Sequence, residues 1–143
     1  ILEHAKSGPG TGPGIVQHQV SSLDWSSDSN YLVTGCSDGS THVWDVTGTL
    51  HHEENNGPGT IHVVRFDPTG QKYVCGTADS NVIIISTESG DQIRKTNVKH
   101  GPVLDASWRN ENCFAVGCED GFVLVFDEYS FVSSSIFNTI SLF

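Results

Sequence analysis

The chain has 143 residues, which is the size of one ordinary domain. Its seven Lys and Arg residues stand against seventeen Asp and Glu residues, and the formal net charge of −10 repels nucleic-acid phosphates and anionic lipid. Direct binding to nucleic acid or to a membrane is therefore not expected, and no apolar run reaches the roughly 20 residues that span a bilayer. A basic polypeptide would still be attracted, although most of this charge is expected to keep the surface soluble.

The chain opens with strand-like sequence at Ile1–His4, followed by a Gly- and Pro-rich run that starts at Ser7 and reads SGPGTGPG. This run lacks the Gly-Lys-Ser/Thr ending of a phosphate-binding loop, and its prolines lack the amide donors that would hold a phosphate. It is predicted to be a linker. The chain contains no methionine and begins abruptly, so we expect it to be a piece of a longer protein.

Three segments that follow this linker align with one another. Gly35, Gly76 and Gly117 recur every 41 residues, and the aspartate three positions later recurs with them. A period of about 40–45 residues that carries several short strands is typical of a β-propeller blade.

Each repeat is predicted to contain strands joined by tight turns. Asp38-Gly39 is a typical tight-hairpin pair, and Asp67-Pro68-Thr69-Gly70 is a typical turn. A fourth, more polar strand is expected near Thr49–Glu53 and near Gln92–Thr96. No helical periodicity competes, so the predicted fold class is all-β. The first strands are predicted at Val20–Trp25, Ile61–Phe66 and Val103–Trp108, and the second strands at Tyr31–Cys36, Tyr73–Thr77 and Cys113–Cys118.

The four cysteines lie within apolar strand-like runs, and none forms a C-x-x-C pair. An even number leaves a disulfide framework formally open. Buried free thiols, and hence an intracellular protein, are favoured because Cys36 and Cys75 both lie in the second strand of their repeats.

The segment GCSDGSTHVWD and its two counterparts resemble WD repeats. In that family a His, a Ser or Thr, the turn Asp and a Trp form a hydrogen-bond relay within each blade. His18, the first candidate histidine, lies two residues closer to its strand than the family pattern has it. The resemblance implies relay roles for Thr34, Asp38 and Trp44 in the first repeat, for Asp79 in the second, and for Asp120 and His100 in the third.

Three repeats are too few to close a ring, because closed propellers use about four to eight blades. We therefore expect a partial β-propeller, an open arc of about three four-stranded WD-repeat blades that is a fragment of a larger ring. The expected boundaries are an outer strand of a preceding blade plus the linker at 1–19, blades at 20–56, 57–98 and 99–136, and an atypical tail at 137–143.

Within the WD-repeat family, the segments VSSLDWSSDSNYLVTGCSDG and GPVLDASWRNENCFAVGCEDG resemble consecutive blades of the transducin β-like (Ebi-type) corepressor subunits. This resemblance implies a nuclear scaffold of corepressor and histone deacetylase assemblies, with partner proteins and basic histone tails as ligands. The amino-terminal dimerisation and F-box-like segments of that group are not found in this sequence, so oligomerisation and ubiquitin-ligase recruitment are not carried over to it.

In a propeller, the entrance to each inner strand and the residue before the turn aspartate face the rim of the central channel. His62 and Glu119 are the first choices for partner contacts, because an amphipathic ring and an anion both suit a peptide. An apolar stripe is instead expected in the core: Leu23, Trp25, Val64, Phe66 and Trp108. The rim candidates are Gln19, Ser21, Ser37, Thr60, His62 and Glu119, with Ala78, Pro102 and Leu104 at matching positions.

Catalysis is not expected. The cluster His51-His52-Glu53-Glu54 resembles a metal site most, but consecutive strand residues point to opposite faces, so it is interpreted as a solvated outer strand. No catalytic residue, metal or cofactor is therefore predicted. The sequence indicates a non-catalytic protein-interaction scaffold. The alternatives are a WD-repeat substrate adaptor of a ubiquitin ligase and an inactive truncated gene product.

Overall fold

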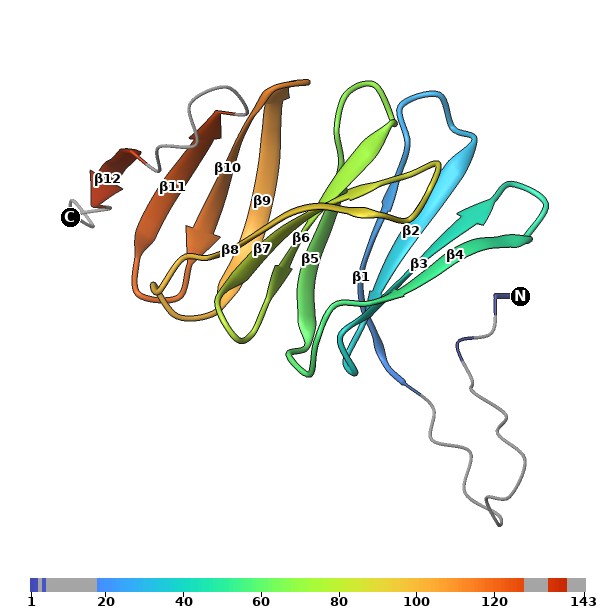
Figure 1. Cartoon of the computed structure of the whole chain (residues 1–143), viewed down its shortest axis with the longest axis horizontal. Helices are drawn as coiled ribbons and strands as arrows, with labels where there is room; N and C mark the ends of the chain where they lie inside the picture. Colours follow the sequence, from blue (N-terminus) through green and yellow to red (C-terminus); the bar gives the residue numbers. More distant parts are fainter. Residues whose placement is uncertain (3, 5–17, 128–133, 139–143) are drawn as a thin grey trace, which may run out of the picture.

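The computed structural model describes residues 1–2, 4, 18–127 and the strand at 134–138. Within these residues the chain forms twelve β-strands and no helix, and the strands make three antiparallel sheets of four strands each (Figure 1). The predicted all-β arc of three four-stranded blades is thereby confirmed. No helix in this part of the chain has the length and apolar character needed to cross a membrane.

In each sheet the strands follow one another in chain order, from an inner strand to an outer one. Blade 1 contains β1 (Val20–Trp25), β2 (Tyr31–Cys36), β3 (Ser40–Asp45) and β4 (Leu50–Asn55). Blade 2 contains β5 (Ile61–Phe66), β6 (Lys72–Thr77), β7 (Asn81–Ser86) and β8 (Gln92–Asn97). Blade 3 contains β9 (Val103–Asn110), β10 (Cys113–Cys118), β11 (Phe122–Asp127) and β12 (Ser134–Asn138).

The turns between strands are stabilised by local features, namely glycines with positive φ and hydrogen bonds from the backbone to aspartate side chains. In the β2–β3 hairpin Gly39 has a φ of 86°, a conformation that favours glycine, and Asp38 Oδ1 accepts the backbone N–H of Ser40 at 3.0 Å. In the β5–β6 turn Asp67 accepts the backbone N–H of Lys72 at 3.1 Å, and Gly70 has a φ of 72°. These bonds fix the turn lengths and with them the register of each hairpin.

The three blades stack like the ribs of a fan, with β1, β5 and β9 next to one another at the inner edge (Figure 1). Most of the buried apolar residues belong to two clusters, and each cluster lies between two blades. One joins Val33 and Val43 of blade 1 to Ile61, Val64 and neighbouring residues of blade 2. The other joins the opposite face of blade 2 to blade 3. Stability therefore comes from contacts between blades, because a single sheet has no second layer of its own.

The repeated glycines lie where successive blades approach most closely. A Cβ atom at Gly35 would come within 2.9 Å of the Ile61 Cβ, and one at Gly76 within 2.9 Å of the Val103 Cβ. A Cβ atom at Gly117 would meet no atom of the described residues within 4 Å. Glycine at the first two positions therefore lets the inner strand of the next blade pack against the backbone.

The predicted core stripe is wrong at two positions in blade 1. Leu23 is 54 % exposed and Trp25 is 52 % exposed, whereas their counterparts Val64 and Phe66 in blade 2 are buried. Ser22 and Asp24 point from β1 toward blade 2, where they accept the backbone N–H groups of Val64 and Phe66. Leu23 and Trp25 thus lie on the opposite face of the sheet, at the end of the arc.

The tail after Asp127 supplies the outer strand of blade 3, because β12 pairs with β11 in an antiparallel register. Most of the predicted outer strand and linker at 1–19, and residues 139–143 of the predicted tail, lie outside the described residues. The domain boundaries stay predictions.

Candidate protein-binding site

In blade 1 two of the side chains predicted for the relay, Thr34 and Trp44, are hydrogen-bonded to each other, and a further partner is one that the sequence did not suggest. Trp44 Nε1 donates to Thr34 Oγ1 at 3.1 Å, and His4 Nε2 contacts the same hydroxyl at 2.7 Å. The predicted histidine, His18, instead lies 3.5 Å from Asp38 Oδ2. Thr34 and Trp44 are both buried, so these bonds satisfy polar groups that water does not reach.

The aspartates of the other two blades have different partners. Asp79 accepts the Thr77 hydroxyl, and this bond is the main reason why the pKa of Asp79 is lowered. Asp120 Oδ2 lies 2.8 Å from His100 Nδ1, and Asp120 Oδ1 accepts the backbone N–H of Phe122 at 3.2 Å. The assignment of these residues to a relay stays a prediction.

Four rim candidates lie together where blades 1 and 2 meet. Gln19 and Ser37 are joined by two hydrogen bonds, since Ser37 N donates to Gln19 O at 2.9 Å and Gln19 N donates to the side-chain oxygen Ser37 Oγ at 3.2 Å. Thr60 Oγ1 donates to Ser37 O at 3.0 Å. The Ser21 hydroxyl lies between Gly35 O and Ile61 O. These polar groups hold the inner edges of the two blades together.

The two first-choice rim residues lie on blades 2 and 3. His62 is half-buried on β5, and its Nδ1 is buried without a hydrogen-bond partner in the described part of the chain. Glu119 is exposed after β10, and its backbone N–H donates to Pro102 O at 2.9 Å. Leu104 is 50 % exposed, so blade 3 also presents an apolar group. Whether these residues bind partners remains to be tested.

The side chains of the cluster His51-His52-Glu53-Glu54 on β4 point alternately to opposite faces, as expected for a strand. His51 Nε2 lies 3.2 Å from Asp45 Oδ2, and its ring contacts Tyr31. His52 Nε2 contacts the backbone oxygen of Glu88 in blade 2. The two imidazoles therefore have separate partners.

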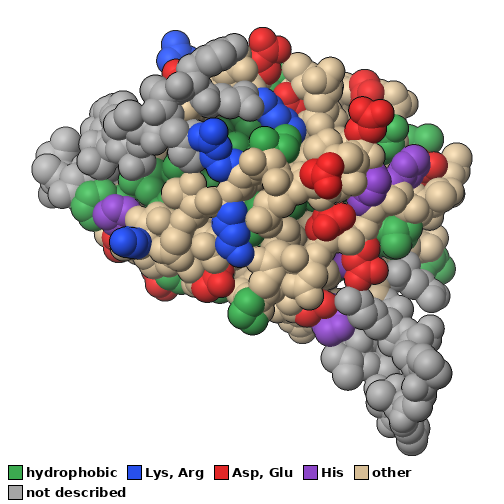
Figure 2. Space-filling view, viewed as in Figure 1, with side chains coloured by type: hydrophobic (Ala, Val, Ile, Leu, Met, Phe, Trp, Pro, Cys, Tyr) green, Lys and Arg blue, Asp and Glu red, His purple; other side chains and the backbone are tan. Residues whose placement is uncertain are grey.

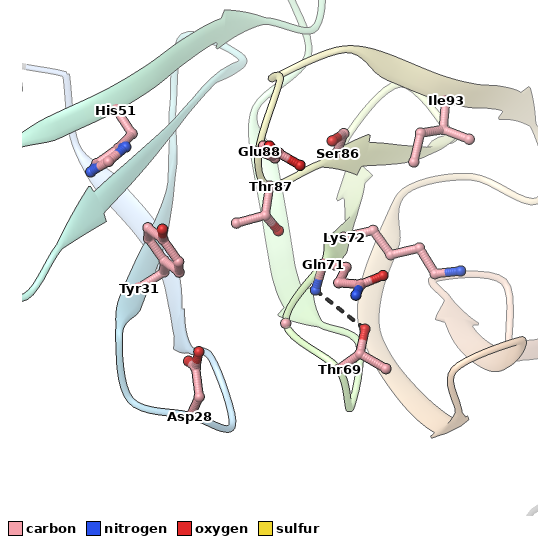
Figure 3. Close-up of a pocket in the computed structure, with 11 residues that line it drawn as sticks. Asp28, Tyr31, His51, Thr69, Gln71, Lys72, Ser86, Thr87, Glu88 and Ile93 are labelled. Carbon is pink, nitrogen blue, oxygen red and sulfur yellow. Dashed lines mark hydrogen bonds between the residues drawn. The ribbon is translucent and has the colours of Figure 1, made fainter.

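A groove of about 690 Å³ lies between blades 1 and 2, a volume typical of ligand sites. In Figure 3, Tyr31 and His51 line the blade 1 side, while Gln71 and Thr87 line the blade 2 side. Ser27 Oγ donates to Pro68 O at 2.7 Å and joins the turns of the two blades. The remaining lining residues are Asp28, Thr69, Gly70, Lys72, Ser86, Glu88 and Ile93.

Thr87 gives this groove its most unusual chemical feature. The residue is 5 % exposed and its hydroxyl has no hydrogen-bond partner among the described residues, although its backbone N–H donates to Gln71 O at 2.9 Å. A buried hydroxyl without a partner costs roughly 1–3 kcal/mol. The Thr87 oxygen is also closed to solvent, so a polar ligand group in the groove would pair with it only after the Thr87 side chain rotates toward the groove.

Charge is distributed unevenly over the outer strands. In the view of Figure 2, carboxylate and histidine side chains gather where β4 lies. Lys and Arg side chains lie over β8. Lys95 Nζ of β8 donates to Asn56 O at 3.2 Å. The groove thus lies next to an acidic strand on one side and a basic strand on the other.

The cysteines are free, and three of the four are buried. Burial raises the pKa of Cys75 to about 12 and raises the pKa values of Cys36 and Cys118. These thiols are therefore protonated at neutral pH, and none of the three has the low pKa of a nucleophilic cysteine.

Sequence reasoning did not find His4, His42 or Thr87. Strand alternation would have found one pair, since Cys36 in β2 and His42 in β3 lie on the face that carries Thr34 and Trp44. No local pattern connects His4 to Thr34, which lies 30 residues away. The burial of Thr87 depends on the packing of two blades, which no motif encodes.

Sequence comparison identifies one repeat directly. The family described as "WD domain, G-beta repeat" matches residues 13–45. The chain is 30 % identical over 96 residues to the F-box-like/WD repeat-containing protein TBL1X of Mus musculus, a match that covers 67 % of this chain and 18 % of that protein. The chain thus spans less than a fifth of this relative's length.

Two further relatives come from a plant and a fungus. The Chromatin assembly factor 1 subunit FAS2 homolog of Oryza sativa subsp. japonica is 31 % identical over 129 residues, covering 78 % of this chain and 25 % of that protein. Protein hir1 of Emericella nidulans is 37 % identical over 79 residues, covering 48 % and 8 %. Among solved structures, the RRP9 WD40 repeats superimpose with a TM-score of 0.76 at 14 % identity, covering 82 % of this chain and 38 % of that one, which supports the fold alone.

Proposed function

We propose that this chain, which carries WD40 repeats, is a non-catalytic scaffold that binds partner proteins in nuclear corepressor or histone deacetylase assemblies. Similarity to TBL1X and to a chromatin assembly factor subunit supports this role. The arc of sheets supports it as well, because such sheets present turns and strand edges from several blades on one surface.

The groove between blades 1 and 2 is the proposed site for an extended partner segment. The unpaired hydroxyl of Thr87 carries this assignment, because a ligand amide or carbonyl would pair with it once the buried Thr87 side chain rotates toward the groove. Tyr31 and the 51 % exposed Ile93 offer apolar contact area beside it. The rim at Ser37, His62 and Glu119 is a second surface for the same class of partner.

A basic peptide fits this chain best. The formal charge of −10 raises the local concentration of cations, and Asp28 and Glu88 outnumber Lys72 among the charged residues that line the groove. A lysine-rich histone tail has this chemistry. Its binding should weaken as salt is added, because screening acts on exposed charges.

The experiment is fluorescence anisotropy of a labelled histone H4 amino-terminal tail peptide titrated with the full chain. We expect saturable binding, and about fivefold weaker binding to Thr87→Val, the equivalent of one hydrogen bond of about 1 kcal/mol. The variant should unfold at an equal or higher urea concentration than the wild type, because valine removes a hydroxyl that has no partner.

Further variants distinguish binding in the groove from binding at the rim. Val46→Ser replaces an exposed apolar residue outside the groove lining and should leave binding unchanged, whereas Ile93→Ser should weaken it. If His62→Ala and Glu119→Gln weaken binding and Thr87→Val does not, the peptide occupies the rim. Equal binding of a scrambled peptide with the same composition would contradict the proposed recognition altogether.

A further inference from the structure

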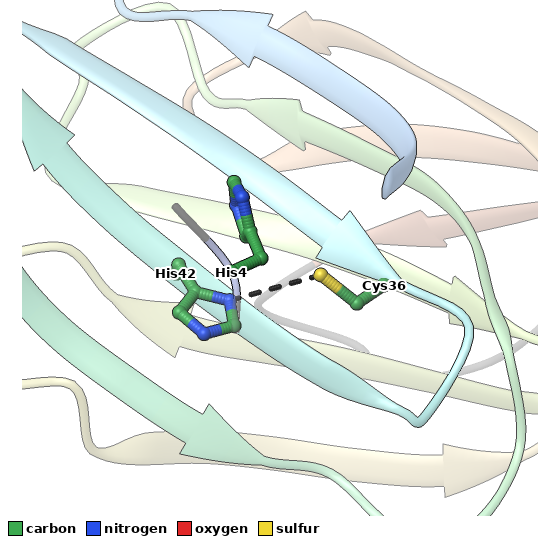
Figure 4. Close-up of side chains that lie close together, drawn as sticks. All are labelled: His4, Cys36 and His42. Atoms are coloured by element: carbon green, nitrogen blue, oxygen red, sulfur yellow. Dashed lines mark hydrogen bonds between the residues drawn. The ribbon is translucent and has the colours of Figure 1, made fainter. Parts of the chain in front are cut away.

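Three side chains with metal-binding atoms converge on the face of blade 1 that points away from blade 2. His4 approaches from the start of the chain, Cys36 ends β2, and His42 lies in β3 (Figure 4). Cys36 is fully buried, His42 is 6 % exposed and His4 is half-buried. One sulfur and two imidazole nitrogens are thus held away from bulk water at a single point.

The spacing of these atoms suits a single ion. One ligand atom from each residue lies within 4.8 Å of the others, and Cys36 Sγ lies 3.8 Å from His42 Nδ1. Zinc binds sulfur at about 2.3 Å and imidazole nitrogen at about 2.0–2.1 Å, so two such ligands on a tetrahedral ion lie roughly 3.3–3.7 Å apart. The sulfur and the His42 nitrogen are already near this separation, and the widest pair needs to close by about 1 Å.

A carboxylate lies behind one imidazole and a backbone group behind the other. His42 Nε2 lies 3.9 Å from Glu53 Oε1, so the nitrogen on the other side of the ring is the one that faces Cys36. His4 has a hydrogen bond to the Leu2 backbone. A carboxylate or a backbone carbonyl behind a histidine is the usual outer support of a metal-binding imidazole.

We propose that His4, Cys36 and His42 form a binding site for one divalent transition-metal ion of the zinc type. Thiolate with imidazole is the ligand set that zinc favours, and three protein ligands leave one position for water or for a partner's side chain. On binding, the Cys36 S–H bond breaks, a metal–sulfur bond forms and the proton passes to the buffer. This site is independent of the groove and of the proposed scaffold role.

The ion would join parts of the chain that are far apart in sequence. His4 precedes Cys36 by more than thirty residues, so a bond through the metal closes a long loop and is expected to stabilise the fold. The ion also competes with one existing contact, because His4 Nε2 lies 2.7 Å from Thr34 Oγ1. Metal-free protein keeps that contact, and metal-bound protein exchanges it for coordination.

Blade 3 provides a matched control. Cys118 stands one residue after the repeated glycine, as Cys36 does, and is also buried, but Leu124 occupies the position that corresponds to His42. Cys118→Ala therefore removes a comparable thiol at a place where leucine stands instead of the facing histidine.

The experiment is titration of the full reduced chain with Co²⁺, followed by absorption spectroscopy, with competition by Zn²⁺. We expect one ion per chain, a near-ultraviolet sulfur-to-cobalt band, release of about one proton and a higher melting temperature. Cys36→Ala should abolish the band, His4→Ala and His42→Ala should weaken affinity at least tenfold, and Glu53→Gln should weaken it about tenfold. Cys118→Ala should bind like the wild type.

Several results would overturn the site. They are the absence of the sulfur band in wild-type protein at micromolar Co²⁺, a band that is lost in Cys118→Ala and kept in Cys36→Ala, and affinity that is unchanged in both histidine variants. Circular dichroism of each variant without metal separates loss of binding from loss of fold. If Cys36→Ala does not fold, the wild-type spectrum and the two histidine variants still decide the question.

Discussion

Asp45 connects protonation directly to the structure of a turn. Its Oδ1 accepts the Thr47 hydroxyl at 2.6 Å and the backbone N–H groups of Thr47 and Thr49 at 2.8 and 2.9 Å, while Oδ2 faces His51. The Thr47 hydroxyl, followed by the Thr49 amide, lowers the pKa of Asp45 to about 2 from an ordinary value of 3.8. The charged carboxylate therefore favours the folded β3–β4 turn.

Lowering the pH should weaken this turn in a defined range. Because the folded pKa is depressed, the contribution is present above about pH 4 and is lost as the pH falls toward about 2. The wild type should therefore lose stability over this range more steeply than Asp45→Asn, as measured by urea midpoints from pH 5 to pH 2. Asp91→Asn, an exposed carboxylate in the outer turn of blade 2, is the control and should follow the wild type. Parallel curves for wild type and Asp45→Asn would contradict the assignment.

At the level of the strands, the effect of replacing the repeated glycine should depend on whether another blade packs against it. None of Gly35, Gly76 and Gly117 has a positive φ, so alanine is conformationally allowed at all three. Alanine at Gly35 or Gly76 would collide with Ile61 or Val103 and should cost roughly 1–3 kcal/mol, which is typical of overpacking.

Alanine at Gly117 should change the free energy of unfolding by less than about 0.5 kcal/mol, because in the described part of the chain no atom lies within 4 Å of the position its Cβ would take. Chemical unfolding of the three single variants makes the comparison. Equal losses at all three positions would mean that the close packing of successive blades is not what requires glycine.

The elements themselves were predictable because their signals are local. The spacing of Gly35 and Gly76 gives the period, and turn residues such as Asp38 and Asp67 divide each repeat into strands. Burial was less predictable, since Trp25 and Phe66 occupy the same place in the repeat but only Phe66 has a blade to pack against. The candidate sites were the least predictable part, because the groove that Thr87 lines exists only where two blades meet.

Across the arc, the blade 1 end differs from the middle blade in how much apolar surface is covered. Blade 2 has both faces buried, in one cluster with blade 1 and in another with blade 3. At the blade 1 end, Val20, Leu23 and Trp25 remain 43–54 % exposed. Neighbouring apolar side chains with this exposure are typical of a surface that another protein layer covers. Trp25 is therefore expected to contribute to association rather than to the stability of the described fold.

Substitution at equivalent positions tests this difference. Trp25→Ala should change the free energy of unfolding by less than about 1 kcal/mol, whereas Phe66→Ala, at the same place in blade 2, should cost about 3–5 kcal/mol. Trp108→Ala should fall between them, because Trp108 is half-buried and its Nε1 donates to Arg65 O at 3.1 Å. Sedimentation velocity at increasing protein concentration should show less self-association for Trp25→Ala than for wild type. A loss of stability in Trp25→Ala as large as that in Phe66→Ala would show that the blade 1 end is already part of a packed core.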